Sequence, residues 1–135
     1  MRKIDNIDFY DSSAIDLWVL GDVCHVKVVV AKIGDLWATV SVDFLGVTEL
    51  TVDDQPATTT QITNGWGGIL AFDVTDKNNG KAKFVIQWEK FNPNITDIIC
   101  YNFSFRELEY KILSIYTEDE YMKDPDDENI IRNLY

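Results

Sequence analysis

The chain has 135 residues, which is enough for one ordinary domain with a self-sufficient core. Hydrophobic residues make up 46% of it and charged residues 26%, which excludes a disordered chain and indicates a soluble globular domain. Asp and Glu number 23 against 12 Lys and Arg, and the net charge of −11 disfavours nucleic acid and membrane surfaces as partners. We expect a basic protein as the partner instead.

Alternating apolar and polar residues predict a meander of three antiparallel strands, starting near Ile15, Cys24 and Leu36. Shorter strands are predicted over 47–52, 69–74, 82–88 and 99–105. Residues 107–116 fit either a strand or one helical stripe, and their β-branched and aromatic content favours a strand. Residues 53–68 are predicted to be irregular, because they contain Pro56, three consecutive Thr and the glycines around Trp66.

Seven or eight short strands predict a single, mainly antiparallel all-β domain over residues 1–135, either a sandwich or a partly open barrel. Residues 117–135 carry seven acidic and two basic residues and form an acidic tail. Within the tail, Asp124-Pro125 is typical of a helix start and predicts a short C-terminal helix over 126–134. Helix capping also accounts for Asp124, Asp126 and Glu128, which lack the spacing of a calcium loop.

The residues that could carry out catalysis do not form a recognisable motif. His25, the only histidine, lies in mid-strand without the sequence context of an activated nucleophile. Cys24 and Cys100 are far apart and are expected to be buried free thiols. Glu107 and Glu109 would share one strand face, and a carboxylate-dependent hydrolase would use this pair. We expect a non-enzymatic protein without cofactor or metal, with the hydrolase as the less favoured alternative.

Trp66 and nearby acids are the candidate contacts for a partner. Trp66 stands between glycines, so it either plugs one end of the fold or contacts another protein. A basic partner would be attracted by the loop acids Asp53, Asp54, Asp73 and Asp76.

Trp18 and Trp37 lie opposite the predicted core faces of their strands and, with Val29, form a second apolar face. This face needs a cover. The cover is either the C-terminal helix, through Ile130, Ile131 and Leu134, or another chain. A monomer and a homodimer that self-associates through Trp18 and Trp37 are therefore both open.

The sequence contains no run of 18 apolar residues, and residues 1–5 lack the apolar stretch of a secretion signal. A cytoplasmic location is therefore expected.

Residues 7–15, with the sequence IDFYDSSAI, precede a two-strand meander and resemble the opening of a loose family of small, acidic, β-rich bacterial proteins. That family begins with a Phe-His-Asp-Ser type segment; Asp11 and Ser12 match it, whereas Tyr10 stands where the family usually has His. Some of its members resemble immunity proteins of contact-dependent toxin systems. The resemblance implies an immunity protein that neutralises a toxin, and it provides no catalytic residues to transfer. The acidic charge of the chain favours a cationic toxin.

Overall fold

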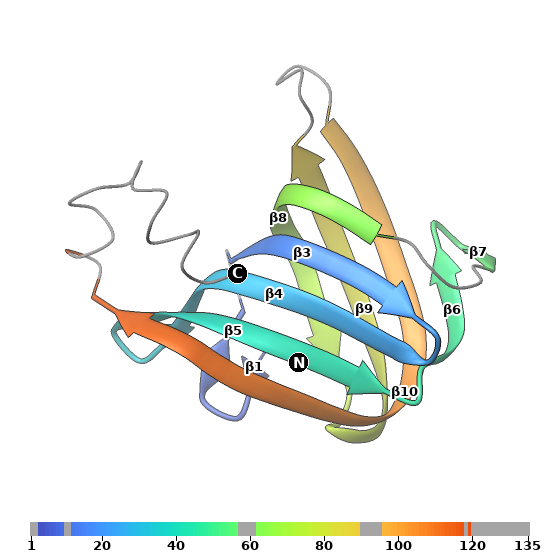
Figure 1. The fold of residues 1–135 in the computed structure, drawn as a ribbon, viewed down its shortest axis with the longest axis horizontal. Coiled ribbons are helices and arrows are strands. Elements are labelled where there is room, and N and C mark those ends of the chain that lie inside the picture. Colours follow the sequence, from blue (N-terminus) through green and yellow to red (C-terminus); the bar gives the residue numbers. More distant parts are fainter. Residues whose placement is uncertain (1–2, 10–11, 57–61, 90–95, 118, 120–135) are drawn as a thin grey trace.

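A computed structural model describes residues 3–9, 12–56, 62–89, 96–117 and 119. Its ten strands belong to one sheet, and all the strand pairs are antiparallel (Figure 1). The strands are β1 (Lys3–Ile4), β2 (Ile7–Asp8), β3 (Ser13–Leu20), β4 (Val23–Ile33), β5 (Leu36–Leu45), β6 (Thr48–Val52), β7 (Gln55–Pro56), β8 (Ile62–Val74), β9 (Asn78–Glu89) and β10 (Thr96–Tyr116).

Six of these strands form a ring. β3 pairs with β4, β4 with β5, β5 with β10, β10 with β9, β9 with β8, and β8 again with β3. The prediction of an all-β, antiparallel fold is confirmed. Because strand pairing continues around this ring, the architecture is a barrel rather than a sandwich of two separate sheets.

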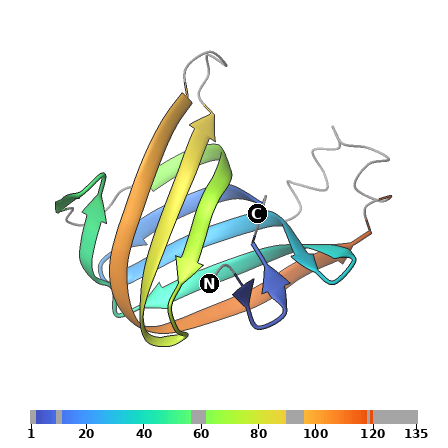
Figure 2. The same ribbon diagram turned by 180° about the vertical axis from the view of Figure 1, so that it is seen from behind.

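The ring is flattened into two layers of strands, which two long strands, β8 and β10, connect because each of them takes part in both layers. β10 pairs with β9 up to Glu107 and with β5 from Glu107 onward. β8 pairs with β3 through residues 62–68 and with β9 through residues 67–74. The first layer therefore consists of β3, β4, β5 and the second half of β10. The second layer consists of the second half of β8, β9, the first half of β10, and β6 (Figure 2).

The N-terminal segment packs against both layers at one end of the barrel. β2 pairs with the end of β4, and Phe9 stacks on Phe72 of β8 with ring centroids 4.3 Å apart. Asp5 accepts hydrogen bonds from the Tyr110 hydroxyl at 2.6 Å and from Lys77 Nζ at 2.7 Å. These contacts join the hairpin β1–β2 to β10 and to the turn before β9.

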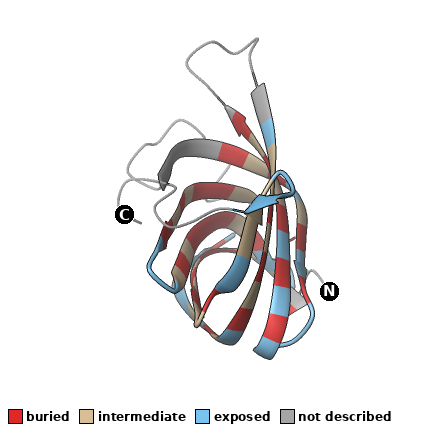
Figure 3. Ribbon diagram, turned by 90° about the vertical axis from the view of Figure 1, so that its right-hand side faces the viewer, coloured by how far each residue is buried: buried red, intermediate tan, exposed pale blue. Residues whose placement is uncertain are grey.

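Aromatic side chains fill the barrel. Phe44 lies in the first layer, and its ring is 5.0–5.5 Å from those of three phenylalanines in the second: Phe84, Phe103 and Phe105. Buried and exposed residues alternate along the strands, as period-two side-chain geometry requires (Figure 3). In a barrel this small, side chains occupy the interior, so a functional surface must lie on its outside.

The structure confirms the predicted meander and shows that residues 107–116 are a strand. The prediction that residues 53–68 are irregular is wrong for two segments, because β7 and the start of β8 lie within it. The predicted helix over 126–134 lies outside the described residues. Among the described residues, no helix has the length and hydrophobicity needed to span a lipid bilayer.

Candidate functional site

The outer surface of the second layer carries side chains in rows that run across the strands. In one row, Ala71 of β8 pairs with Val85 of β9, which pairs with Cys100 of β10. The next row consists of Asp73, Lys83, Asn102 and Thr51. Strands lie about 4.8 Å apart, so this second row is about 14 Å long. We call the outward-facing residues of β6, β8 from Leu70, β9 and β10 up to Ser104 the second-layer face.

Large apolar side chains are exposed on this face. Leu70 is the extra residue of a bulge between Ile69 and Ala71, and its side chain is 56% exposed. Ile98 lies opposite Gln87 and is 57% exposed. With the half-buried Val85 and Cys100, these residues form an apolar strip of the kind that protein interfaces bury.

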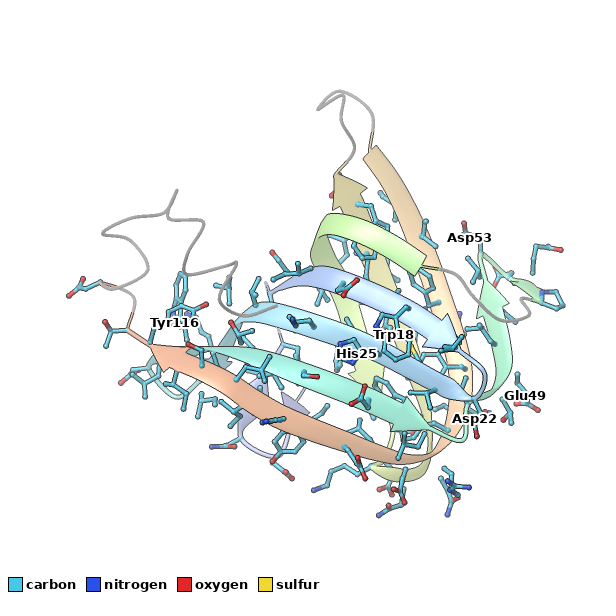
Figure 4. All side chains as sticks on the ribbon, viewed as in Figure 1. Trp18, Asp22, His25, Glu49, Asp53 and Tyr116 are labelled. Atoms are coloured by element: carbon cyan, nitrogen blue, oxygen red, sulfur yellow. The ribbon has the colours of Figure 1, made fainter. Side chains whose placement is uncertain are left out.

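Two of the acids predicted to bind a partner border this strip where β6 joins β10. Asp53 and Asp54 form the tight turn between β6 and β7, both with left-handed backbone (φ of 51° and 64°). The carboxylate of Asp53 accepts the Cys100 N–H at 2.9 Å, and the Asp53 N–H donates to the Cys100 carbonyl at 2.8 Å. Asp53 therefore holds the β6–β7 turn against β10 and is also an exposed charge (Figure 4).

The other two predicted acids lie on the β8 side of the face. Asp73 is exposed and pairs directly with Lys83, whereas Asp76 lies in the turn after β8 and accepts the Asn78 N–H at 3.3 Å. The sheet thus places Asp53 and Asp73 at opposite ends of adjacent rows. Asp53, Asp54 and Asp73 therefore lie around one surface, whereas Asp76 lies in the turn beyond β8, and the four acids do not form a single cluster.

A pocket of about 300 Å³ opens on the same face, over β10 and between β6 and β9. Sequence reasoning did not identify it, because its walls come from three strands that only the sheet brings together. Glu49 stands at its edge and accepts a hydrogen bond from the Ser104 hydroxyl at 3.1 Å. The lining consists of Glu49, Thr51, Lys81, Ala82, Asn102, Phe103 and Ser104.

Trp66 does not lie in a loop as predicted, because its backbone belongs to strand β8. Neighbouring Gly67 and Gly68 pair with β3 and β9, which turns a glycine-rich stretch into a corner of the barrel. The Trp66 side chain lies outside the described residues, and its predicted role as core plug or contact stays a prediction.

Trp18 and Trp37 lie on the first layer and do not form one patch. Trp18 stacks on His25 at 4.9 Å, whereas Trp37 meets Tyr116 edge-on at 6.4 Å (Figure 4). Trp18 pairs with His25 and Trp37 with Lys32, so the two indoles are about 20 Å apart along β4. Any self-association would involve one of them or two separate contacts.

The outer surface between these tryptophans is covered within the chain. Ile15, Val29 and Thr39 are buried although they lie outside the core cluster. Lys27 is buried there too; burial lowers the pKa of its ammonium, while the charge of Asp16 raises it. Val29 is therefore buried within this chain. The residues predicted to cover it, Ile130, Ile131 and Leu134, lie outside the described residues.

The candidate acid–base residues lie on the first layer. His25 Nδ1 and Asp43 Oδ1 are joined by a hydrogen bond of 2.6 Å, and Glu109 pairs with Asp43 from the next strand. Glu107 lies at the bend of β10, opposite both Leu45 and Asn78. Neither glutamate lines the pocket around Glu49.

The two cysteines differ in environment. Cys24 is buried, and burial together with the nearby Asp43 raises the pKa of its thiol to about 12. Cys100 is only half-buried, contrary to the expectation of two buried thiols, and its sulfur accepts a hydrogen bond from Asn102 Nδ2 at 3.4 Å. Within the described residues, no group of three or more His, Cys, Asp or Glu could hold a metal ion.

The comparisons with known proteins yield no relatives: no family model matches the chain, and neither a curated protein nor a solved structure shows significant similarity.

Proposed function

We propose that this chain is a non-enzymatic protein-binding domain whose partner is a basic protein. The observation that carries the proposal is the second-layer face, where Leu70 and Ile98 are exposed. The exposed acids Asp53 and Asp73 border these residues, and Lys83 lies on the same face beside Asp73. An apolar centre with a polar rim is the usual anatomy of a protein interface. The net charge of −11 would attract a cationic protein and speed its association.

The most concrete version is an immunity protein that neutralises a cationic toxin. Two features support this version: the acidic charge, and the resemblance of residues 7–15 to a family with immunity-protein-like members. Binding alone would suffice for neutralisation, so this version requires no catalytic group. It also agrees with the position of Glu107 and Glu109 away from the pocket lining.

The test begins with an affinity column that carries the folded chain, loaded with native lysate at low salt and eluted with a salt gradient. We expect one stoichiometric basic protein, which is then purified and titrated against variants. Ile98→Ser and Leu70→Ser should each weaken its binding by about tenfold, as expected for large apolar side chains that an interface buries.

Matched controls come from equally exposed residues elsewhere. Ile115→Ser and Leu20→Ser replace side chains that are 50% and 63% exposed on other parts of the barrel, and they should leave binding unchanged. Asp73→Asn should shift elution to lower salt, because it removes one attractive charge. Equal losses in the control variants, or elution that salt does not affect, would contradict the proposed face.

A further inference from the structure

We infer that the pocket on the second-layer face binds the guanidinium group of an arginine side chain. The lining residues alone carry the inference that the pocket binds arginine. The further statement that a basic protein supplies this arginine rests on the proposed function. The volume of about 300 Å³ is at the lower limit of ligand pockets, which suits one long side chain rather than a larger ligand.

Glu49 is positioned to act as the anionic group. The Ser104 hydroxyl donates to Oε2, which orients the carboxylate and leaves Oε1 able to accept bonds from a ligand. In the described part of the chain Lys81, also in the lining, forms no ion pair with Glu49, so the carboxylate charge is not neutralised by it.

A bulge in β6 determines how Glu49 is placed. Asn102 pairs with Thr51, whereas Ser104 pairs with Thr48, so β6 has one extra residue between these two pairs. The φ of Glu49 is 57°, in the left-handed region that the first residue of a bulge can adopt. Bulges redirect side chains, and this one lies in the strand that contributes Glu49 and Thr51 to the pocket wall.

Asn102 supplies a second oriented acceptor. Its amide nitrogen is directed at the sulfur of Cys100, so the amide oxygen is the group left to accept a hydrogen bond in the pocket. A carboxylate oxygen and an amide oxygen together match the planar, multi-donor fork of a guanidinium better than the point charge of an ammonium.

The test uses N-acetyl-arginine amide as the probe and follows the backbone amide signals of the folded chain by NMR. We expect shifts at Glu49, Thr51, Asn102 and Ser104, with an affinity in the millimolar range because only one side chain binds. The neutral isostere N-acetyl-citrulline amide should leave these signals in place.

Two charge variants should act in opposite directions. Glu49→Gln should lower the affinity for the probe by about tenfold, because it removes a charge-assisted hydrogen bond. Lys81→Gln should raise the affinity for the probe, because it removes from the lining a positive charge that repels the guanidinium. Ser104→Ala, which frees the Glu49 carboxylate to rotate, should give a smaller loss than Glu49→Gln.

An absence of shifts in the pocket, or equal binding by wild type and Glu49→Gln, would overturn the inference. So would binding of N-acetylglycine that is lost in Lys81→Gln, because the pocket would then be an anion site. These outcomes leave the proposed function standing if Leu70→Ser and Ile98→Ser still weaken the basic partner. Conversely, unchanged partner binding in those two variants leaves the arginine site intact.

Discussion

Cys24 and Cys100 show how the same residue type acquires different properties from its surroundings. Cys24 faces the barrel interior, where the thiolate form would lose its hydration, and the pKa of the thiol rises to about 12. Cys100 lies on the second-layer face, where it is half-buried. The sequence predicts both as small hydrophobes, and strand orientation separates them.

Thiol labelling tests this contrast. At pH 8 a thiol of pKa about 12 is ionised in about one molecule in ten thousand, so Cys24 should be inert in the folded protein. We expect the reagent to modify one thiol rapidly in native protein and two in denaturant. Cys100→Ser should abolish the rapid reaction and Cys24→Ser should not; the reverse pattern would mean that the two strand faces are misassigned.

At the scale of the element, β8 depends on one glycine where it passes between the layers. A Cβ atom on Gly67 would lie 2.6 Å from Ile86 Cγ2 and 2.7 Å from Trp88 Cε3, both far inside van der Waals contact. Gly68, the next residue, has no atom within 4 Å of the same position. Gly67 is therefore needed for the close packing of a strand. The sequence pattern around it, which is rich in glycine, instead predicts a loop.

Alanine substitutions at Gly67 and Gly68 form a matched test of the close packing at Gly67. Gly67→Ala should lower the free energy of unfolding by about 1–3 kcal/mol, the usual cost of overpacking a core. Gly68→Ala should change it by less than about 0.5 kcal/mol, because the added methyl group would meet no other atom. Urea unfolding of both variants measures the difference. Equal stabilities would show that the corner can relax, and that β8 is less tightly packed than described.

At the scale of the whole molecule, the N-terminal hairpin helps to hold the open end of the barrel together. Asp5 lies near one end of the sequence, yet it contacts Lys77 before β9 and Tyr110 in β10. The hydrogen bond from Lys77, with a further one from Tyr110, holds the pKa of Asp5 below its ordinary value of 3.8. Such a long-range contact ties the first layer to the second.

The lowered pKa gives this contact a pH dependence. A carboxyl whose pKa is depressed by folding stabilises the protein above its unfolded pKa, and this contribution disappears as pH falls through the folded value. Asp5→Asn should therefore lower the urea midpoint at neutral pH and converge with wild type in acid, well below pH 3.8. Tyr110→Phe, which keeps the ion pair with Lys77, should cost less at neutral pH. If the urea midpoint of Asp5→Asn were lower than that of wild type by the same amount at every pH, the carboxylate charge would be unimportant for stability.

The sequence by itself determined the local features: the all-β class, the strands from Ile15 to Phe44, and the strand over 107–116. Period-two alternation is a property of neighbouring residues, so no tertiary information is needed to read it. The acidic charge and the resulting expectation of a basic partner follow from composition in the same way.

Only the tertiary structure decided which residues meet. Pairing of β8 with β3 made a strand of the glycine-rich stretch around Trp66, and a bulge exposed Leu70. Pairing of β6, β10, β9 and β8 placed Asp53 and Asp73 on one face, and the register of β3 and β5 on β4 placed Trp18 far from Trp37. The pocket around Glu49 unites three strands that are distant in sequence. Register and bulges depend on contacts between segments far apart along the chain, and a single-residue shift would turn each of these side chains to the opposite face.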